Sequence, residues 1–192
     1  MTHSVATATR IYPGMMDNSI EFFLSQDKLH VIQNNKILPF CEIALDTIGV
    51  LQNEINKDIN VKLALFEMFP NSNMQRVEQF ARCRFGGLDF EGDIKNGELQ
   101  DGEFWECPKR GNCPHEGTLC KLPTFNKVRL TKQDVQLIQK TSTDKINEVI
   151  AEEMHLPMGS FHKAKKYLYE KLCVQTKQEV VRIGILLNLI QL

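Results

Sequence analysis

Between residues 130 and 174, apolar residues recur at intervals of three and four, which is typical of amphipathic helices. Thr131 and Asp134 have the spacing of a capping box, so we expect a helix to begin there with Val135 and Ile138 facing inward. A second helix is expected to bury a further apolar set at the same intervals. That set is Ile146, Val149, Ile150 and Met154.

The periodicity stops at residues 155–159, where Pro157 disfavours helix at the preceding residue and suits the start of a new helix. A third helix is predicted over residues 158–172, with Phe161, Leu168 and Leu172 on its inner face. The turn before it is as short as helix-turn-helix packing requires. Its basic side chains lie largely on other faces, and they are His162, Lys163, Lys165, Lys166 and Lys171.

The distribution of charge along the chain supports DNA as the ligand of this third helix. Residues 127–192 hold eleven Lys and Arg against seven Asp and Glu, a net of +4, whereas residues 1–126 hold twelve against seventeen, a net of −5. A basic helix of this kind fits a major groove, where lysines meet phosphates and base edges. The alternative is that the lysines form a solvated face of a helical bundle.

The whole segment from Leu130 to Val174 resembles the LuxR/GerE-type helix-turn-helix without gaps. The shared residues are Leu130, Thr131, Asp134, Leu137, Ile138, Asn147, Ile150, Ala151, Glu152, Met154, Leu156, Ser160, Lys171, Leu172 and Val174. The resemblance implies a four-helix domain whose third helix reads the major groove and whose fourth often mediates dimerisation. The chain departs from the family pattern at Asp144, Pro157 and Ala164, which leaves the operator and the first turn open.

The resemblance also implies roles for individual side chains of the third helix. His162, Lys163 and Lys166 match positions that reach base edges, and Ser160, Tyr167 and Lys171 match positions that contact phosphates. After Val174, residues 177–192 are apolar around much of a helix, so a second copy of the chain, the acidic N-terminal region or other packing within the chain must cover them. This run is too short and too often interrupted to span a bilayer.

Four of the six cysteines lie upstream, in a cysteine-rich segment over residues 83–120 that is rich in turns and poor in apolar residues between Glu106 and Cys120. They are Cys83, Cys107, Cys113 and Cys120, separated by twenty-three, five and six residues. A loop without a hydrophobic core needs a cross-link to hold its conformation. Four thiolates could supply one by binding structural zinc in a tetrahedral site. An iron-sulfur or redox-switching cluster and free buried thiols are the alternatives, and His115 could replace one ligand. Cys41 and Cys173 are expected to be packing residues.

The N-terminal part predicts a small β-hairpin and several helices. Residues 29–39 read as two strands about an Asn-Asn turn. One helix is expected over residues 42–56 with Leu45, Ile48, Leu51 and Ile55 inward, and another from about Val61 to Pro70. A third begins at Ser72 or Asn73, ends at Gly86-Gly87, and carries Met74, Val77, Phe80 and Ala81.

The fold class expected from these elements is mainly α with a small β-hairpin. A flexible N-terminus over residues 1–17 would precede an α+β partner or sensing domain over residues 18–125 and the helix-turn-helix domain over residues 126–192. Residues 18–125 also resemble the upstream part of regulators encoded in Bacteroidetes genomes and mobile elements, which carry a C-P-x-R-G-N-C-P-x-E-G-x-x-C pattern. This resemblance implies a partner domain whose loop is cross-linked by a metal ion.

The function expected is a bacterial transcription regulator that binds double-stranded DNA as a homodimer. A protein-interaction adaptor that binds RNA polymerase or another regulator is the alternative. An enzyme is not expected, because four thiolates would close the zinc coordination sphere and the H-x-E signature of zinc deaminases is missing, which leaves Glu106 and Glu116 as surface carboxylates. The first residues lack the apolar stretch of a signal peptide, so a reducing cytoplasm is expected.

Overall fold

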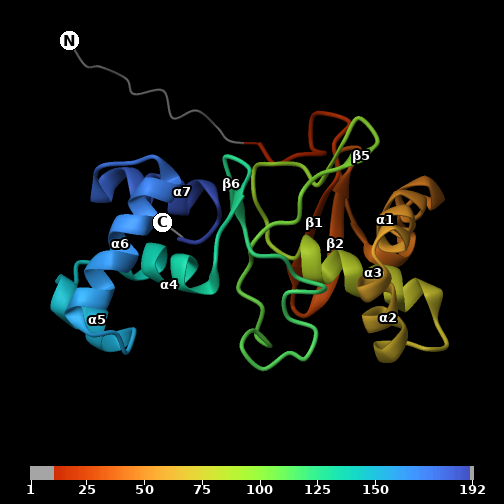
Figure 1. Cartoon of the computed structure of the whole chain (residues 1–192). Coiled ribbons are helices and arrows are strands. Elements are labelled where there is room, and N and C mark those ends of the chain that lie inside the picture. The colour runs from red at the N-terminus through yellow and green to blue at the C-terminus, as the bar shows by residue number, and fades with distance from the viewer. Residues whose placement is uncertain (1–10, 191–192) are drawn as a thin grey trace, which may run out of the picture. The chain divides into compact units, whose positions relative to one another are not determined.

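The computed structural model describes residues 11–190 and separates into two compact units, of which the first ends at Gly102 and the second begins at Glu103 (Figure 1). Both contain helices and small antiparallel sheets. The division lies within the cysteine-rich segment and precedes three of its four cysteines, whereas the sequence placed the boundary near residue 125. The reason is packing: Phe104 belongs to the buried core of the C-terminal helices, and Leu122 and Phe125 pack against that core.

The first unit is built on a three-stranded antiparallel sheet in the order β1-β2-β3. Its strands are β1 (Glu21–Ser25), β2 (Lys28–Gln33) and β3 (Lys36–Pro39). The predicted Asn34-Asn35 turn is confirmed, since both residues have positive φ, 52° and 61°, as a tight two-residue hairpin requires. A second such turn at Gln26-Asp27 joins β1 to β2. The sequence therefore predicted one hairpin where the chain forms a three-stranded sheet.

Three helices follow the sheet. After the short 3-10 turn η1 (Phe40–Glu42), they are α1 (Leu45–Lys57), α2 (Ile59–Met68) and α3 (Asn73–Arg84). Asp58 caps α2 and Ser72 caps α3 through side-chain oxygens. Helix α3 packs on both β1 and α1. A small hairpin closes the unit, formed by β4 (Ile94–Lys95) and β5 (Glu98–Leu99).

Aromatic residues dominate the core of the first unit. Phe22 of β1 lies with its ring centroid 6.2 Å from that of Phe40 and 6.1 Å from that of Phe85, and Phe85 meets Phe80 edge to face. All four rings are buried. The predicted inner face of α1 is partly wrong, because Leu45 is 81% exposed while Leu51 and Ile55 are buried. On α3, Val77, Phe80 and Ala81 are buried as predicted, but Met74 is exposed.

The second unit begins with the cysteine-rich loop, continues through a short hairpin and ends in four helices. These elements are β6 (Thr124–Phe125), β7 (Val128–Arg129), α4 (Lys132–Thr141), α5 (Asn147–Glu153), α6 (Met158–Leu172) and α7 (Lys177–Leu186). The capping box of Thr131 and Asp134 is present at the start of α4. The bounds of α6 agree with the sequence prediction.

The core of the second unit confirms most of the predicted inner faces. Val135 and Ile138 of α4 are buried, and so are the inner residues of α6. Two predictions for the second helix are wrong: Ile146 is 64% exposed and Val149 is 37% exposed, because α5 is only seven residues long and only Ile150 and Ala151 reach the core.

Packing within the chain covers much of the apolar run after Val174. Helix α7 packs on α4 and buries Val180 and Ile183, and Leu189 beyond it enters the same core. Gly184 allows this close approach, because a Cβ there would lie 2.8 Å from Cγ2 of Ile138. Leu186 on the opposite side is 66% exposed. None of the helices in residues 11–190 has the length and apolar character that a membrane span needs.

Candidate nucleic-acid interface

Helix α6 is held at both ends by local backbone geometry. The turn between α5 and α6 passes through His155 with a φ of 53°, and the amide of Leu156 donates to the carbonyl of Ala151 at 2.9 Å. Pro157 is the N-cap of α6, and Cys173 ends the helix with a left-handed φ of 56°. In Figure 1, α6 is the longest helix of the blue part of the ribbon, with α5 beside its first turn. The short turn therefore joins two helices that pack on each other.

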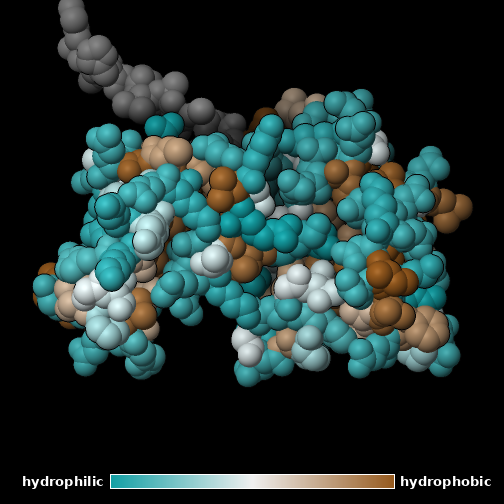
Figure 2. All heavy atoms as spheres, in the orientation of Figure 1, coloured by the Kyte–Doolittle hydropathy of each residue, from teal (hydrophilic) through white to brown (hydrophobic). Residues whose placement is uncertain are grey.

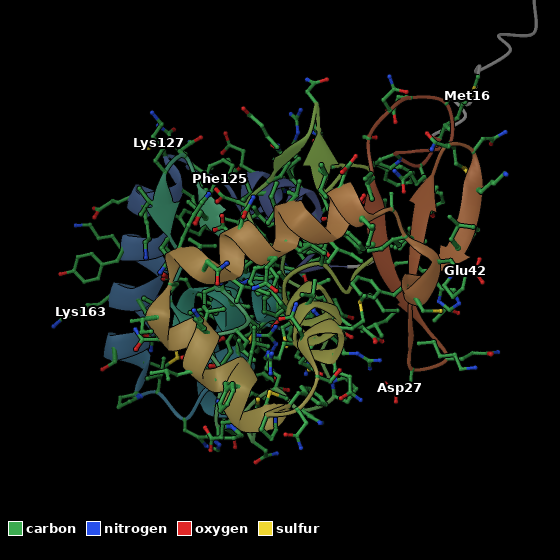
Figure 3. All side chains as sticks on the ribbon, turned by 90° about the vertical axis from the view of Figure 1, so that its right-hand side faces the viewer. Met16, Asp27, Glu42, Phe125, Lys127 and Lys163 are labelled. Atoms are coloured by element: carbon green, nitrogen blue, oxygen red, sulfur yellow. The ribbon has the colours of Figure 1, made fainter. Side chains whose placement is uncertain are left out.

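The two faces of α6 differ in chemistry. Phe161, Leu168 and Leu172 are buried on the inner face. The outward face carries Ser160, His162, Lys163, Lys166 and Tyr167, all exposed and polar or amphipathic, together with the exposed carboxylate Glu170. The stick view shows Lys163 projecting away from the ribbon (Figure 3). Five of the six residues that the sequence singled out for DNA contact thus share one exposed face.

The four lysines of α6 fall into two pairs. Lys163 and Lys166 lie on the outward face, and the only ion pair that either makes with a described residue is a 3.8 Å contact from Lys166 to Glu170. Lys165 instead donates to Oδ1 of Asn147 at 3.1 Å and lies over the ring of Tyr169. Lys171 donates to Oδ2 of Asp134 at 2.6 Å. The inner pair therefore ties α6 to α5 and α4.

Lys171 is the sixth residue that the sequence predicted to contact DNA. Its ion pair with Asp134 indicates a structural role in place of a phosphate contact. Asp134 also accepts the amide of Thr131 at 2.8 Å, so one carboxylate caps α4 and binds α6. Burial raises the pKa of Asp134, but the hydrogen bonds from Lys171 and Thr131 outweigh it, and the pKa lies below its usual range. The sequence suggested the capping box but gave no signal for this second contact.

We expect the Asp134–Lys171 pair to stabilise the second unit rather than to bind phosphate. In a double-mutant cycle of Asp134→Asn and Lys171→Met, urea unfolding should give a coupling energy of about 1–2 kcal/mol at neutral pH. The coupling should fall as the pH drops through the lowered pKa of Asp134, because protonation removes the charge. Additive losses would show that the pair is not energetically linked.

Two more lysines, one in α4 and one in the segment that follows it, pair with a carboxylate of α5. Glu153 of α5 binds both Lys140 and Lys145, which fixes the segment between α4 and α5. These hydrogen bonds lower the pKa of Glu153. Lys177 donates to the carbonyl of Thr143 at 2.8 Å. Lys163 on the outward face of α6 makes no ion pair with a described residue, in contrast to Lys132, Lys140, Lys145 and Lys171 of the same unit.

The cysteine-rich loop is anchored by Glu116 and Arg110. The Glu116 side chain is only 9% exposed, accepts the amide of Gly111 at 2.7 Å and pairs with Lys132 of α4 at 2.9 Å. The hydrogen bond from Lys132 is the main cause that lowers the pKa of Glu116, and the bond from the Gly111 amide lowers it further. Arg110 lies 4.2 Å from the ring centroid of Phe104 and donates to the carbonyl of Trp105. The interpretation of Glu116 as a surface carboxylate is therefore wrong, since it joins the loop to α4.

Replacing Glu116 with Gln should loosen the loop. We expect a loss of about 1–2 kcal/mol in the free energy of unfolding, because the ion pair disappears and the Gly111 amide keeps at most a weaker acceptor. In a C41S/C173S background, the thiols of the loop should also react faster with a disulfide reagent. Glu106→Gln is the matched control, because Glu106 is an exposed carboxylate beside Cys107. Equal effects of the two substitutions would contradict the anchoring role.

The structure does not assemble the predicted zinc site. Within residues 11–190, no three His, Cys, Asp or Glu side chains lie where they could share a metal ion. Cys83 is on α3 of the first unit, where its sulfur accepts from Gln79, and Cys107, Cys113 and Cys120 belong to the second. Zinc binding stays a prediction of the cysteine pattern, tested by metal analysis of the purified protein and by unfolding with and without a chelator.

Cys41 and Cys173 are exposed thiols, so the expectation that they are packing residues is wrong. Cys41 lies in the 3-10 turn before α1, and Cys173 occupies the end of α6 where the chain leaves the helix. Neither position reaches a core.

Comparisons of the chain with models of known protein families, with curated proteins and with solved structures return no match.

Proposed function

We propose that the second unit is a DNA-binding domain and that α6 enters the major groove of double-stranded DNA as the recognition helix of a transcription regulator. The observation that carries this proposal is the outward face of α6, where two lysines project from a helix whose opposite face is locked into the core. A helix held in this way can enter a groove without unfolding its support.

The charge arrangement supports the proposal beyond the net charge of the segment. Asp134, Glu116 and Glu153 bind lysines of α4, α6 and the intervening turn, and so reduce the repulsion within the domain. The cations left on α6 are available for phosphates, whose neutralisation releases counterions. In this proposal, Lys163, Lys166 and His162 contact base edges, and Ser160 and Tyr167 contact the backbone of the duplex.

Selection of the purified full-length protein from a random duplex library tests the proposal. We expect enrichment of one sequence, which should bind at least about a thousandfold more tightly than a scrambled duplex of the same length at physiological salt. Titrations at several salt concentrations should give a linear dependence of log affinity on log salt. Absence of enrichment, with equal binding to both duplexes, would overturn sequence-specific recognition.

The second candidate function is a protein-interaction adaptor that binds RNA polymerase or another regulator, and the exposed apolar residues of α5 favour it. Ile146 and Val149 are exposed to solvent at the start of α5, where a partner protein could cover them. An Ile146→Ser variant tests the adaptor: it should weaken capture of RNA polymerase or the other regulator, and it should leave binding to DNA unchanged, because Ile146 is not on α6. The adaptor would replace the DNA-binding proposal if the wild-type protein captured polymerase but enriched no duplex.

A further inference from the structure

Helix α2 of the first unit is apolar on two opposite faces. Val61, Ala64 and Leu65 are buried against the rest of the unit, where α2 packs on α1 and α3. On the other side a stripe of three large apolar side chains faces solvent. The stripe consists of Ile59, Leu63 and Phe66, which are 64%, 60% and 55% exposed. The space-filling view shows hydrophobic side chains gathered at the surface over α1 and α2 (Figure 2).

The spacing of the stripe is that of a coiled-coil seam. Ile59, Leu63 and Phe66 are separated by four and three residues, so Leu63 takes heptad position a and the other two take position d. The buried residues of α2 then fall at positions b, c and f, on the far side of the helix. A helix that buries one apolar face in its own unit and presents an a/d seam to solvent can pair with another helix through that seam.

The charges beside the seam are complementary between two copies of α2. Lys62 occupies position g and Glu67 occupies position e, both are exposed, and no ion pair joins either to another residue of the described chain. In a parallel pair of helices, the g side chain of one lies beside the e side chain five residues further along the other, so Lys62 of each copy would meet Glu67 of the other. An antiparallel pair centred on Leu63 would instead bring the two Lys62 side chains to the same flank.

We propose that the first unit associates with a second copy of this chain through a parallel α2–α2 contact, with Leu63 at its centre and two Lys62–Glu67 ion pairs at its edges. The contact is short, and a dimer based on it is expected to dissociate on dilution. This proposal is independent of DNA binding and stands or falls without it. It also assigns self-association to the first unit, whereas the family resemblance assigns it to the last helix.

Sedimentation of the full-length protein without DNA, over a range of concentrations, tests the interface. Wild type should show a monomer–dimer equilibrium, and Leu63→Glu should raise the dimer Kd about tenfold or more, because it places a charge in the centre of the seam. Leu186→Glu is the matched control, since Leu186 is an equally exposed leucine on α7. Circular dichroism checks that both variants fold. A protein that is monomeric throughout, or dimers lost in L186E and kept in L63E, would overturn the proposal.

Charge exchange tests the parallel direction. Lys62→Glu and Glu67→Lys should each weaken the dimer several-fold, and the double variant K62E/E67K should return to within about twofold of wild type. Ile59→Cys in a C41S/C173S background should cross-link to its own copy under oxidation, because position d faces itself only in a parallel pair. Ser25→Cys, exposed in the same unit, should not cross-link. A dimer whose double variant stays as weak as the single variants and whose I59C form does not cross-link contradicts the parallel contact.

Discussion

The double variant K163A/K166A is expected to lose about a hundredfold or more in affinity for the selected duplex, with the fold of the second unit unchanged. Both side chains leave the outward face of α6, and neither is part of the core or of the contacts to α4 and α5. The slope of log affinity against log salt should become shallower by about one for each lysine that binds a phosphate. Thermal unfolding should move little, since exposed substitutions change stability by about 0.5 kcal/mol or less.

A control must remove the same charge elsewhere. The variant K28A/K36A does so from exposed positions on the sheet of the first unit, and it should bind the duplex as the wild type does. Single substitutions then separate two roles: Lys166→Ala should relax the sequence preference if Lys166 contacts a base, whereas loss of a phosphate contact should weaken all duplexes alike. If K163A/K166A bound as tightly as K28A/K36A, α6 would not be the DNA-reading helix.

The helices of the second unit could be predicted because their signals are local. The capping pattern of Thr131 and Asp134 fixes the start of α4, and Pro157 fixes the start of α6. The 3.6-residue spacing of Phe161, Leu168 and Leu172 then gives the inner face of α6. The same spacing wrongly predicted that Ile146 and Val149 face the core, because periodicity does not show where a helix begins and ends, and α5 is only seven residues long.

The first strand of the sheet could not be predicted from the same kind of signal. Glu21 is a carboxylate in a fully buried strand position, and it interrupts the apolar run around Ile20 and Phe22. The turn at Gln26-Asp27 lacks the glycine or asparagine that indicates a hairpin, although both residues adopt positive φ. The sequence could not predict that Glu21 is buried, because its burial depends on the pairing of β1 with β2 and on the packing of α3 on β1.

Contacts between distant residues decided the remaining features of the candidate site. Five of the six side chains that the sequence predicted to contact DNA do share one exposed face. The sequence could not show that Lys171, unlike Lys166, is held by a carboxylate of α4. Asp134 lies 37 positions before Lys171, and Glu116 lies 16 before Lys132, so the two ion pairs are products of the tertiary fold. The two lysines differ in their pairs: Lys171 is held at 2.6 Å by a carboxylate that is 15% exposed, whereas Lys166 meets the 57% exposed Glu170 at 3.8 Å and can exchange it for a phosphate.

Glu21 has a strongly raised pKa in the described part of the chain. Burial raises its pKa to about 9, and the negative charges of Asp89 and Glu91 add to this, while the amide of Asp89 and the cation of Lys95 oppose it. One carboxyl oxygen accepts the Asp89 amide at 2.9 Å, and the other is buried with no hydrogen-bond partner. The folded unit therefore holds this carboxyl in its neutral form at pH 7.

We expect the free energy of unfolding of the first unit to fall as the pH rises. Between the ordinary pKa of 4.5 and the raised value near 9, the unfolded chain releases the proton of Glu21 and the folded chain keeps it. The folded state thus binds the extra proton, and stability should decrease by up to about 1.4 kcal/mol for each pH unit in this window. Below pH 4.5 both states are protonated, and the contribution of Glu21 is fully present.

Glu21→Gln removes this dependence because the amide is neutral at every pH. Urea unfolding from pH 5 to pH 9 should show a flatter profile for E21Q than for the wild type, with the variant the more stable of the two at pH 8–9. Glu42→Gln, at an exposed position near the end of the same sheet, should leave the slope of the wild type unchanged. A wild-type profile as flat as that of E21Q would mean that the Glu21 carboxyl is ionised in the folded protein, and β1 would then have to admit a charge or water beside Phe22.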